Sequence, residues 1–357
     1  MTGAERFLAA CRATPVDATP VWFMRQAGGS LPAYLALRER LAVIEIARHP
    51  EHCAEVSAGA ATALGTDGAI MFADIMLLAE AMGVELELTA EGPRIDRPIR
   101  SLADLERLRE VDPTADLGFI LEAIGRTRSA LGSTAAVIGL AGGPFTMAAY
   151  LIEGGPSRDH RVAKAMLFGA PDVWAALLDR IANATIGYVR AQVAAGAQAI
   201  QVFDSWAGSL GPAEYDRAVR PWTARILRAI GEAGVPSIHF AAAGAALLER
   251  LADGAEVVGV DSGQSLGVVR DRLGPGRAVQ GNLDPARLLA GWAAIETGVV
   301  EVLRGAGGAP GHVFNTGHAI ARETDPAVLR AVVDLVHERT ARPGRAVVVE
   351  PGPAVPA

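Results

Sequence analysis

Short apolar runs recur along the chain, each entered through Gly, Pro or a polar turn and followed by an Ala- and Leu-rich stretch with helical spacing. The runs are almost continuously apolar rather than alternating, as in parallel strands that are buried on both faces. The pattern predicts eight strands, at 20–25, 68–74, 135–142, 197–204, 235–240, 255–261, 277–283 and 311–317. Helical patterns lie between them, for example at 104–111, 171–196, 212–234 and 325–340.

Eight strand-then-helix units predict an α/β fold, a (β/α)₈ TIM barrel formed by one domain over residues 1–340. A doubly wound open sheet is the alternative. Residues 84–99 alternate and contain a Gly-Pro turn, which predicts a hairpin inserted after the second strand. Residues 341–357 are rich in Pro and Gly and are predicted to form a loose tail.

The composition and net charge of the chain limit the classes of molecule that it is expected to bind. Half of the 357 residues are hydrophobic, which is enough for a sizeable core. The net charge is −7 and no segment gathers Lys and Arg, so nucleic acid and anionic membranes are poor partners. The chain has no apolar run of about 18 residues and no signal-peptide pattern. With only Cys11 and Cys53 as cysteines, a cytoplasmic location is predicted.

Polar residues follow the predicted strands. In a barrel the chemistry lies on the loops at the carboxyl ends of the strands, so these side chains are expected to ring one mouth. The residues at these positions are Arg25, Gln26, Asp74, Tyr150, Asp204, Ser205, His239, Asp261, Asn282, Asp284 and His318.

Three of these residues have competing interpretations. Asp284 precedes Pro285 at a helix start, so capping is favoured over a role in the site. Asp74 lies among apolar residues and needs hydrogen-bond donors, which favours contact with a ligand. Arg25 is suited either to an ion pair across the mouth or to a ligand carboxylate, and its residue type leaves both open.

Two hydrolase classes are disfavoured. Ser205 and His318 suggest a nucleophile with its base, but the serine lies in "DSWAG" and not in a G-x-S-x-G elbow. His239, His318, Asp261 and Asp284 form a conceivable metal-ligand set, but Arg25 would repel a metal at the same mouth. The histidines His160, His312 and His337 belong to none of these motifs.

Several segments together resemble the uroporphyrinogen decarboxylase family, in its order and spacing, from about residue 5 to residue 340. They are "PVWFMRQAG", "FADI" with Asp74, "GGPFTMAAYLIEGG" with Tyr150, "VFDSWAG" with Ser205, "VQGNLDP" and "FNTGHAIARETDP" with His318. The resemblance implies a cytoplasmic homodimeric barrel in haem and tetrapyrrole biosynthesis. Its reaction removes the four acetate carboxyls of uroporphyrinogen III, giving coproporphyrinogen III, with no metal or organic cofactor.

The resemblance also implies roles for single residues. Substrate contacts are expected at Arg25, Gln26, Ala27, Gly28, Gly29, Asp74, Tyr150, Ser205 and His318. Additional contacts are predicted at Arg38, Phe203 and Arg322, of which Arg322 stands where the family commonly has proline. Asp74, Arg25 and Tyr150 are the expected catalytic residues. The family's corrinoid and coenzyme-M methyltransferases activate a thiol with zinc, held by a His-x-Cys element and a later cysteine, and this chain has no cysteine after Cys53. That branch is therefore disfavoured.

The chain departs from the family's usual M-R-Q-A-G-R-[YS]-L-P-E-Y-R pattern. Gly29, Ala33 and Leu35 stand where the family has Arg, Glu and Arg, and Ser262 replaces a Trp. Losing one charge-assisted contact to a substrate with eight carboxylates weakens binding by roughly 10- to 100-fold. Arg322 is predicted to compensate. The alternative function is a paralogue that binds a tetrapyrrole or another anion without efficient decarboxylation.

Overall fold

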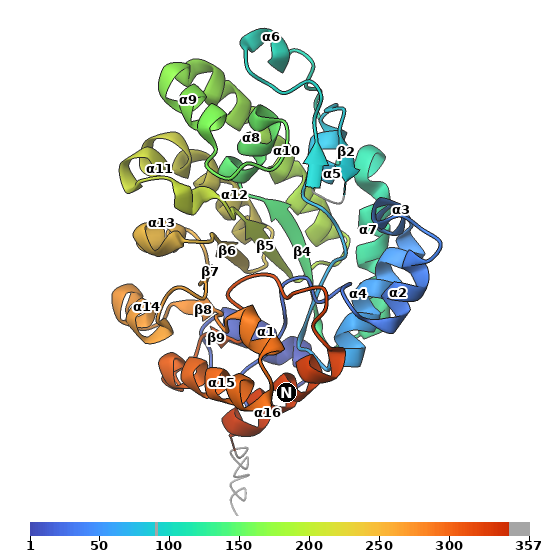
Figure 1. The fold of residues 1–357 in the computed structure, drawn as a ribbon, viewed down its shortest axis with the longest axis vertical. Coiled ribbons are helices and arrows are strands. Elements are labelled where there is room, and N and C mark those ends of the chain that lie inside the picture. Colours follow the sequence, from blue (N-terminus) through green and yellow to red (C-terminus); the bar gives the residue numbers. More distant parts are fainter. Residues whose placement is uncertain (90–91, 343–357) are drawn as a thin grey trace, which may run out of the picture.

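The computed structural model describes residues 1–89 and 92–342. A curled parallel sheet forms its centre, and helices are arranged around the outside of the sheet (Figure 1). In order across the sheet, its seven strands are β1 (Gly68–Ile70), β4 (Ala136–Gly142), β5 (Ala199–Phe203), β6 (Ser237–Phe240), β7 (Val257–Gly259), β8 (Ala278–Gln280) and β9 (His312–Val313). Each lies inside a predicted strand. The order never reverses, whereas a doubly wound sheet requires a reversal, so that alternative is wrong.

The first predicted strand, 20–25, is not a regular strand. Within it only Val21 forms a sheet-type bridge, to Phe314. The reason is that the Val21 N–H donates to the Asp67 carboxylate, at 2.8 Å, instead of to a neighbouring strand. The segment nevertheless bonds to both ends of the sheet. The Trp22 N–H donates to the Phe314 carbonyl at 3.2 Å, and the Asp67 N–H donates to the Val21 carbonyl at 2.8 Å.

The helices begin repeatedly at a proline, which suits the first helical turn because its missing N–H has no partner there anyway. They are α1 (Gly3–Cys11), α2 (Pro32–Arg38), α3 (Val43–Arg48), α4 (Pro50–Leu64), α5 (Met76–Ala81), α6 (Leu102–Leu105), α7 (Pro113–Leu131), α8 (Pro144–Glu153), α9 (Arg161–Gly169), α10 (Pro171–Ala194), α11 (Pro212–Ala218), α12 (Arg220–Glu232), α13 (Leu248–Leu251), α14 (Leu266–Leu273), α15 (Trp292–Ala306) and α16 (Pro326–Thr340).

Two helical predictions need correction. The pattern over 212–234 forms two helices, α11 and α12, because Pro221 cannot continue the preceding turn and Val219 leaves the helical conformation. The pattern over 104–111 gives only the short α6. The predicted hairpin does form, as antiparallel β2 (Glu87–Thr89) and β3 (Gly92–Arg94).

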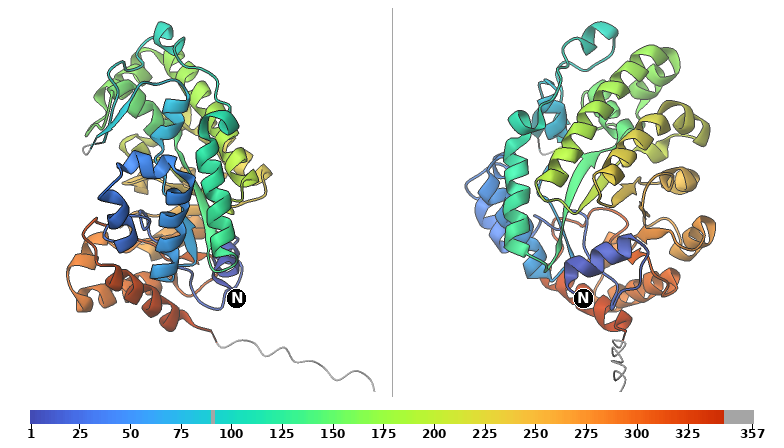
Figure 2. Two further views of the ribbon diagram at one scale, coloured as in Figure 1. Left: turned by 90° about the vertical axis from the view of Figure 1, so that its right-hand side faces the viewer. Right: turned by 180° about the vertical axis from the view of Figure 1, so that it is seen from behind.

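Two hydrophobic cores lie on the two faces of the curled sheet. The larger packs the helices against its outer face. The smaller fills the inside of the curl, where Trp22, Ile138, Ile238 and Val313 meet Phe7 of α1. Helix α1 contacts β1, β4, β8 and β9, and it lies next to the chain's N-terminus in both views of Figure 2. It therefore closes the amino end of the sheet.

The predicted domain limits remain a prediction. Helix α16 ends at Thr340, and residues 343–357 of the predicted tail lie outside the described residues. Within the described part of the chain, no helix combines the length and the apolarity needed to cross a membrane.

Candidate active site

Four of the predicted side chains form one electrostatic group at the carboxyl ends of the strands. Arg25 lowers the pKa of Asp74, of Tyr150 and of His318, although in each case burial is the larger influence. A charge that influences all three pKa values lies near all three groups. We call Arg25, Asp74, Tyr150 and His318 the mouth cluster.

Arg25 is exposed and stands in a left-handed backbone conformation, with φ +67°. Within residues 1–89 and 92–342 its guanidinium forms no hydrogen bond and no ion pair within 4.0 Å. The ion pair considered from the sequence is therefore not formed. All five N–H donors of the guanidinium are available to a ligand.

Asp74 follows β1 and opens the first turn of α5. One carboxylate oxygen accepts the Met76 N–H at 2.8 Å, and no donor among the described residues reaches the other. Surrounding protein raises the pKa of Asp74, while the Met76 N–H and Arg25 lower it. Because the residue is also exposed to water, this desolvation is incomplete. Asp74 thus presents a free acceptor oxygen at the mouth.

Tyr150 is half-buried on α8. Burial raises the pKa of its phenol, the Asp74 charge raises it further, and Arg25 opposes both. The phenol is therefore protonated at neutral pH and serves as a hydrogen-bond donor. Its ring lies 4.2 Å from the ring of Trp206, which directly follows Ser205 at the end of β5.

His318 follows β9 and is exposed. Burial and then Arg25 lower its pKa, while Asp261 raises it, so the imidazole is mainly neutral near pH 7. Its ring meets Phe240 at 6.4 Å, and Phe240 meets Phe203 at 6.5 Å. Phe203 therefore supports the histidine side of the mouth.

Gln26 is the predicted site residue whose side chain has least freedom. It is 1% exposed, it accepts the Phe23 N–H at 2.9 Å, and it donates to the Gly68 carbonyl at 2.7 Å. The side chain holds the loop after Arg25, and the Gln26 N–H also stays within the loop, where it donates to the Phe23 carbonyl at 3.0 Å. Ala27 and Gly28 are likewise buried.

The loop after β9 lies against the loop after Arg25. The Ile320 N–H donates to the Met24 carbonyl at 3.1 Å, and the Ser30 hydroxyl donates to the Thr324 carbonyl. A Cβ added at Gly29 would lie 3.4 Å from the Arg322 carbonyl oxygen. The backbone of Arg322 thus lies next to Gly29, the position where the family usually has a second arginine.

Arg38 does not join this group. Its guanidinium donates to the nearby Leu41 carbonyl, and within the described residues no hydrogen bond or ion pair joins it to the mouth cluster.

The residues of the rejected hydrolase classes have other tasks. Asp284 caps a helical turn through the Ala286 N–H, as predicted. His239 is fully buried and hydrogen-bonded to the Leu251 carbonyl at 3.1 Å. The described residues contain no group of three or more His, Cys, Asp and Glu side chains able to hold a metal. No hydrogen bond joins Ser205 to His318 in these residues.

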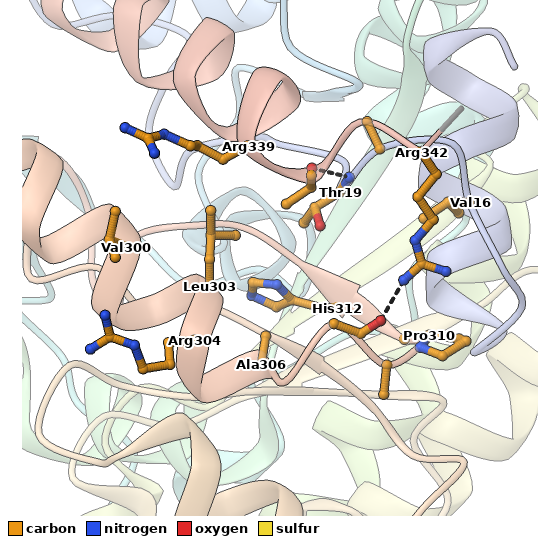
Figure 3. Close-up of a pocket in the computed structure, with 15 residues that line it drawn as sticks. Val16, Thr19, Val300, Leu303, Arg304, Ala306, Pro310, His312, Arg339 and Arg342 are labelled. Atoms are coloured by element: carbon orange, nitrogen blue, oxygen red, sulfur yellow. Dashed lines mark hydrogen bonds between the residues drawn. The ribbon is translucent and has the colours of Figure 1, made fainter. Parts of the chain in front are cut away.

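A cavity of about 430 Å³ lies at the opposite end of the sheet, near the amino end of β9 (Figure 3). Arg304, Arg339 and Arg342 line it, together with the buried His312. Arg339 is paired with Glu296 at 2.8 Å, and Arg342 donates to the Gly308 carbonyl. Since two of its three guanidiniums are already bound within the fold, the cavity is a weaker ligand site than the mouth.

Sequence reasoning missed three residues beside the mouth: Thr146, His160 and Trp206. Trp206 had a usable signal, because it is the next residue after Ser205 in "VFDSWAG". Thr146 and His160 become visible only through contacts between distant segments.

Comparison with known proteins gives consistent results. A family described as "Uroporphyrinogen decarboxylase (URO-D)" matches residues 2–339. The uroporphyrinogen decarboxylase of Streptomyces coelicolor is 48% identical over 338 residues, which is 94% of this chain and 95% of the relative. That of Trichlorobacter lovleyi is 44% identical over 339 residues, or 95% and 99% of the two chains.

Solved structures show the same fold at lower identity. A methyltransferase from Methanosarcina mazei has a TM-score of 0.77 at 22% identity, covering 96% of this chain and all of the other. A putative vitamin-B12-independent methionine synthase from Listeria monocytogenes has a TM-score of 0.57 at 13% identity, covering 91% and 98%. At these identities the likeness concerns the fold alone.

Proposed function

The chain belongs to the uroporphyrinogen decarboxylase family, and from this premise we propose how its mouth cluster carries out the decarboxylation. Its activity is decarboxylation of uroporphyrinogen in tetrapyrrole biosynthesis, as in relatives that match nearly the whole chain. The observation that carries the site assignment is that Arg25, which has no ion pair within the described residues, lies near Asp74, one of whose oxygens accepts no hydrogen bond there. One group suits an acetate carboxylate and the other suits pyrrole N–H donors.

The substrate supplies its own electron sink. Protonation of the pyrrole carbon next to the acetate-bearing carbon makes the ring cationic. The bond to the carboxylate then breaks, CO₂ leaves, and the electron pair flows into that cation. A second protonation, at the former acetate methylene, forms the methyl group, and loss of the proton first added to the ring carbon restores the neutral aromatic pyrrole. Four repetitions convert the four acetates of uroporphyrinogen III into the methyl groups of coproporphyrinogen III.

Asp74 stabilises the cation in this proposal. Its free oxygen accepts hydrogen bonds from the pyrrole N–H groups, and these bonds strengthen as positive charge develops on the ring. Water reaches the carboxylate, but the surrounding protein makes this electrostatic effect larger than it would be in bulk solvent.

Arg25 and Tyr150 act on the carboxyl groups. The guanidinium of Arg25 holds the reacting acetate as a two-donor fork, and it gives up its own proton too reluctantly to be an obvious acid. The protonated phenol of Tyr150 donates to a side-chain carboxylate. Ser205 and His318 complete the ring of contacts, His318 through a propionate.

Arg322 supplies part of the positive charge that Gly29 lacks. The proposal is supported by the 3.4 Å approach of the Gly29 Cβ position to the Arg322 carbonyl. It is also supported by the absence of any ion pair to Arg322 among the described residues. A guanidinium can therefore reach the same side of the mouth from the adjacent loop.

The proposal also covers three features of the whole protein: closure of the barrel, oligomeric state and location. Segment 20–24 takes the place of the eighth strand and closes the barrel, supported by its bonds to Phe314 and Asp67. A homodimer and a cytoplasmic location follow from the family resemblance and remain predictions.

The function is tested by anaerobic incubation with uroporphyrinogen III, oxidation of the products and chromatography by carboxyl number. Heptacarboxylate is expected first, followed by hexa-, penta- and tetracarboxylate products. Tight binding without any of these products would support the non-decarboxylating paralogue instead.

A further inference from the structure

Three aromatic rings form a stack behind the mouth. The Trp206 ring centroid lies 4.2 Å from that of Tyr150 and 4.6 Å from that of His160, with interplanar angles of 39° and 32°. His160 is 3% exposed and starts α9, whereas Tyr150 lies on α8. Trp206 is therefore held between residues of two neighbouring helices.

Hydrogen bonds also hold the backbone of Trp206. Its N–H donates to the Thr146 hydroxyl at 3.1 Å, and that hydroxyl donates to the buried Asp204 carboxylate at 2.9 Å. Thr146 and Tyr150 are four residues apart on α8, so they share one face of the helix. One face of α8 thus holds Trp206 at both its backbone and its indole.

The backbone of His160 precedes α9 and accepts the Lys164 N–H at 2.9 Å, and its ring lies in the stack. Its Nδ1 is buried with no hydrogen-bond partner among the described residues, and its backbone adopts φ +53°. Burial and Lys164 lower its pKa, so the ring is neutral at pH 7. Besides Trp206, its ring has an edge contact with Phe145 at 5.9 Å. Within the described residues, aromatic packing and not a hydrogen bond at Nδ1 therefore holds the ring.

We infer that Trp206 is a positioning residue for Tyr150, and that His160 is the support behind it. The stack limits rotation of the Tyr150 ring and keeps its hydroxyl beside Asp74 and Arg25 before substrate arrives. This inference rests on the proposed function of the mouth cluster.

The test compares variants at positions 160 and 206 in the anaerobic uroporphyrinogen III assay. Trp206→Leu is expected to lower kcat about 10-fold, and His160→Leu about 5-fold, with KM within about twofold of wild type. His160→Phe keeps an aromatic ring and is expected to retain at least about half of kcat. Trp222→Leu changes a tryptophan on α12, outside the mouth, and is the matched control with unchanged kcat.

A double-mutant comparison separates positioning from general loosening. In a Tyr150→Phe background there is no hydroxyl to position. Adding Trp206→Leu to that variant is therefore expected to lower kcat further by less than about twofold. Equal losses for Leu and Phe at position 160, or an undiminished loss in the Tyr150→Phe background, would overturn the inference. Should Trp206→Leu not fold, the two variants at position 160 decide. A wild-type enzyme without decarboxylated products would reject the proposed function, which is a different result.

Discussion

At the scale of single residues, Arg25 combines an unusual backbone with an unused side chain. A residue with a side chain at φ +67° costs on the order of 1 kcal/mol relative to ordinary backbone. Gly29, four residues on, has φ +61° and bears no such cost. The strained backbone of this loop is therefore at Arg25, which belongs to the mouth cluster. Arg322 lies next to Gly29, which has no side chain.

Arg322→Ala tests whether the guanidinium of Arg322 supplies the positive charge that is missing at Gly29 for substrate binding. Because Arg322 is exposed, we expect KM for uroporphyrinogen III to rise about 5- to 10-fold, with kcat within about twofold and a larger effect at low salt. Adding Gly29→Arg to this variant is expected to restore much of the affinity. Arg228→Ala, on α12, is the control.

The idea fails if Arg322→Ala leaves KM unchanged. It also fails if Gly29→Arg lowers KM equally in the presence and absence of Arg322, because the two guanidiniums would then act independently.

At the scale of elements, α8 depends on a carboxylate at its first turn. Asp204 is fully buried, and one of its oxygens accepts both the N–H and the hydroxyl of Thr146, at 2.8 and 2.9 Å. The other oxygen is buried without a partner in the described residues. A Cβ at Gly143 would lie 2.2 Å from the Asp204 Cβ, so only glycine permits this approach. Burial raises the pKa of Asp204 to about 6.

This raised pKa gives a definite pH dependence of stability. Between about pH 4 and pH 6 the folded protein keeps a proton that the unfolded chain releases, so the free energy of unfolding falls as pH rises through this window. The loss is on the order of 2 to 3 kcal/mol and is complete above about pH 7. Asp204→Asn keeps an acceptor for Thr146 and is expected to remove this loss.

Urea unfolding of wild type and Asp204→Asn at pH 4.5 and pH 8 measures the effect. The variant is expected to gain stability relative to wild type as pH rises. Asp271→Asn, at an exposed aspartate on α14, should keep the wild-type pH dependence. If the free energy of unfolding of Asp204→Asn kept the wild-type pH dependence, ionisation of the buried Asp204 would not destabilise the folded protein.

Elements differed in how well the sequence predicted them. The seven sheet strands were predictable because parallel strands buried on both faces are almost continuously apolar. Segment 20–25 has the same pattern, but its hydrogen bond to Asp67 comes from a residue far along the chain. In the site, strand ends and motifs predicted Arg25, Asp74, Tyr150 and His318, and the roles of these residues stay a prediction. The support by Thr146 and His160 was not predicted, because it depends on the packing of α8 and α9.

At the scale of the whole molecule, stability and chemistry lie at opposite ends of the sheet. At the amino end, Asp67 accepts from Arg6 at 2.6 Å and from the Val21 N–H, and it contacts His337 at 2.8 Å. This network joins α1, the segment before β1 and α16. At the carboxyl end, the mouth cluster leaves Arg25 and one oxygen of Asp74 unpaired among the described residues. Changes at the mouth should therefore affect activity much more than stability.

The most direct test of this account is the kcat of Asp74→Asn in the anaerobic uroporphyrinogen III assay, with the thermal midpoint measured alongside. We expect kcat to fall about 100- to 1,000-fold, because the neutral amide cannot stabilise the pyrrole cation, with the midpoint close to that of wild type. Asp271→Asn should retain full activity. A folded Asp74→Asn variant with kcat within about threefold of wild type would contradict the central role of Asp74.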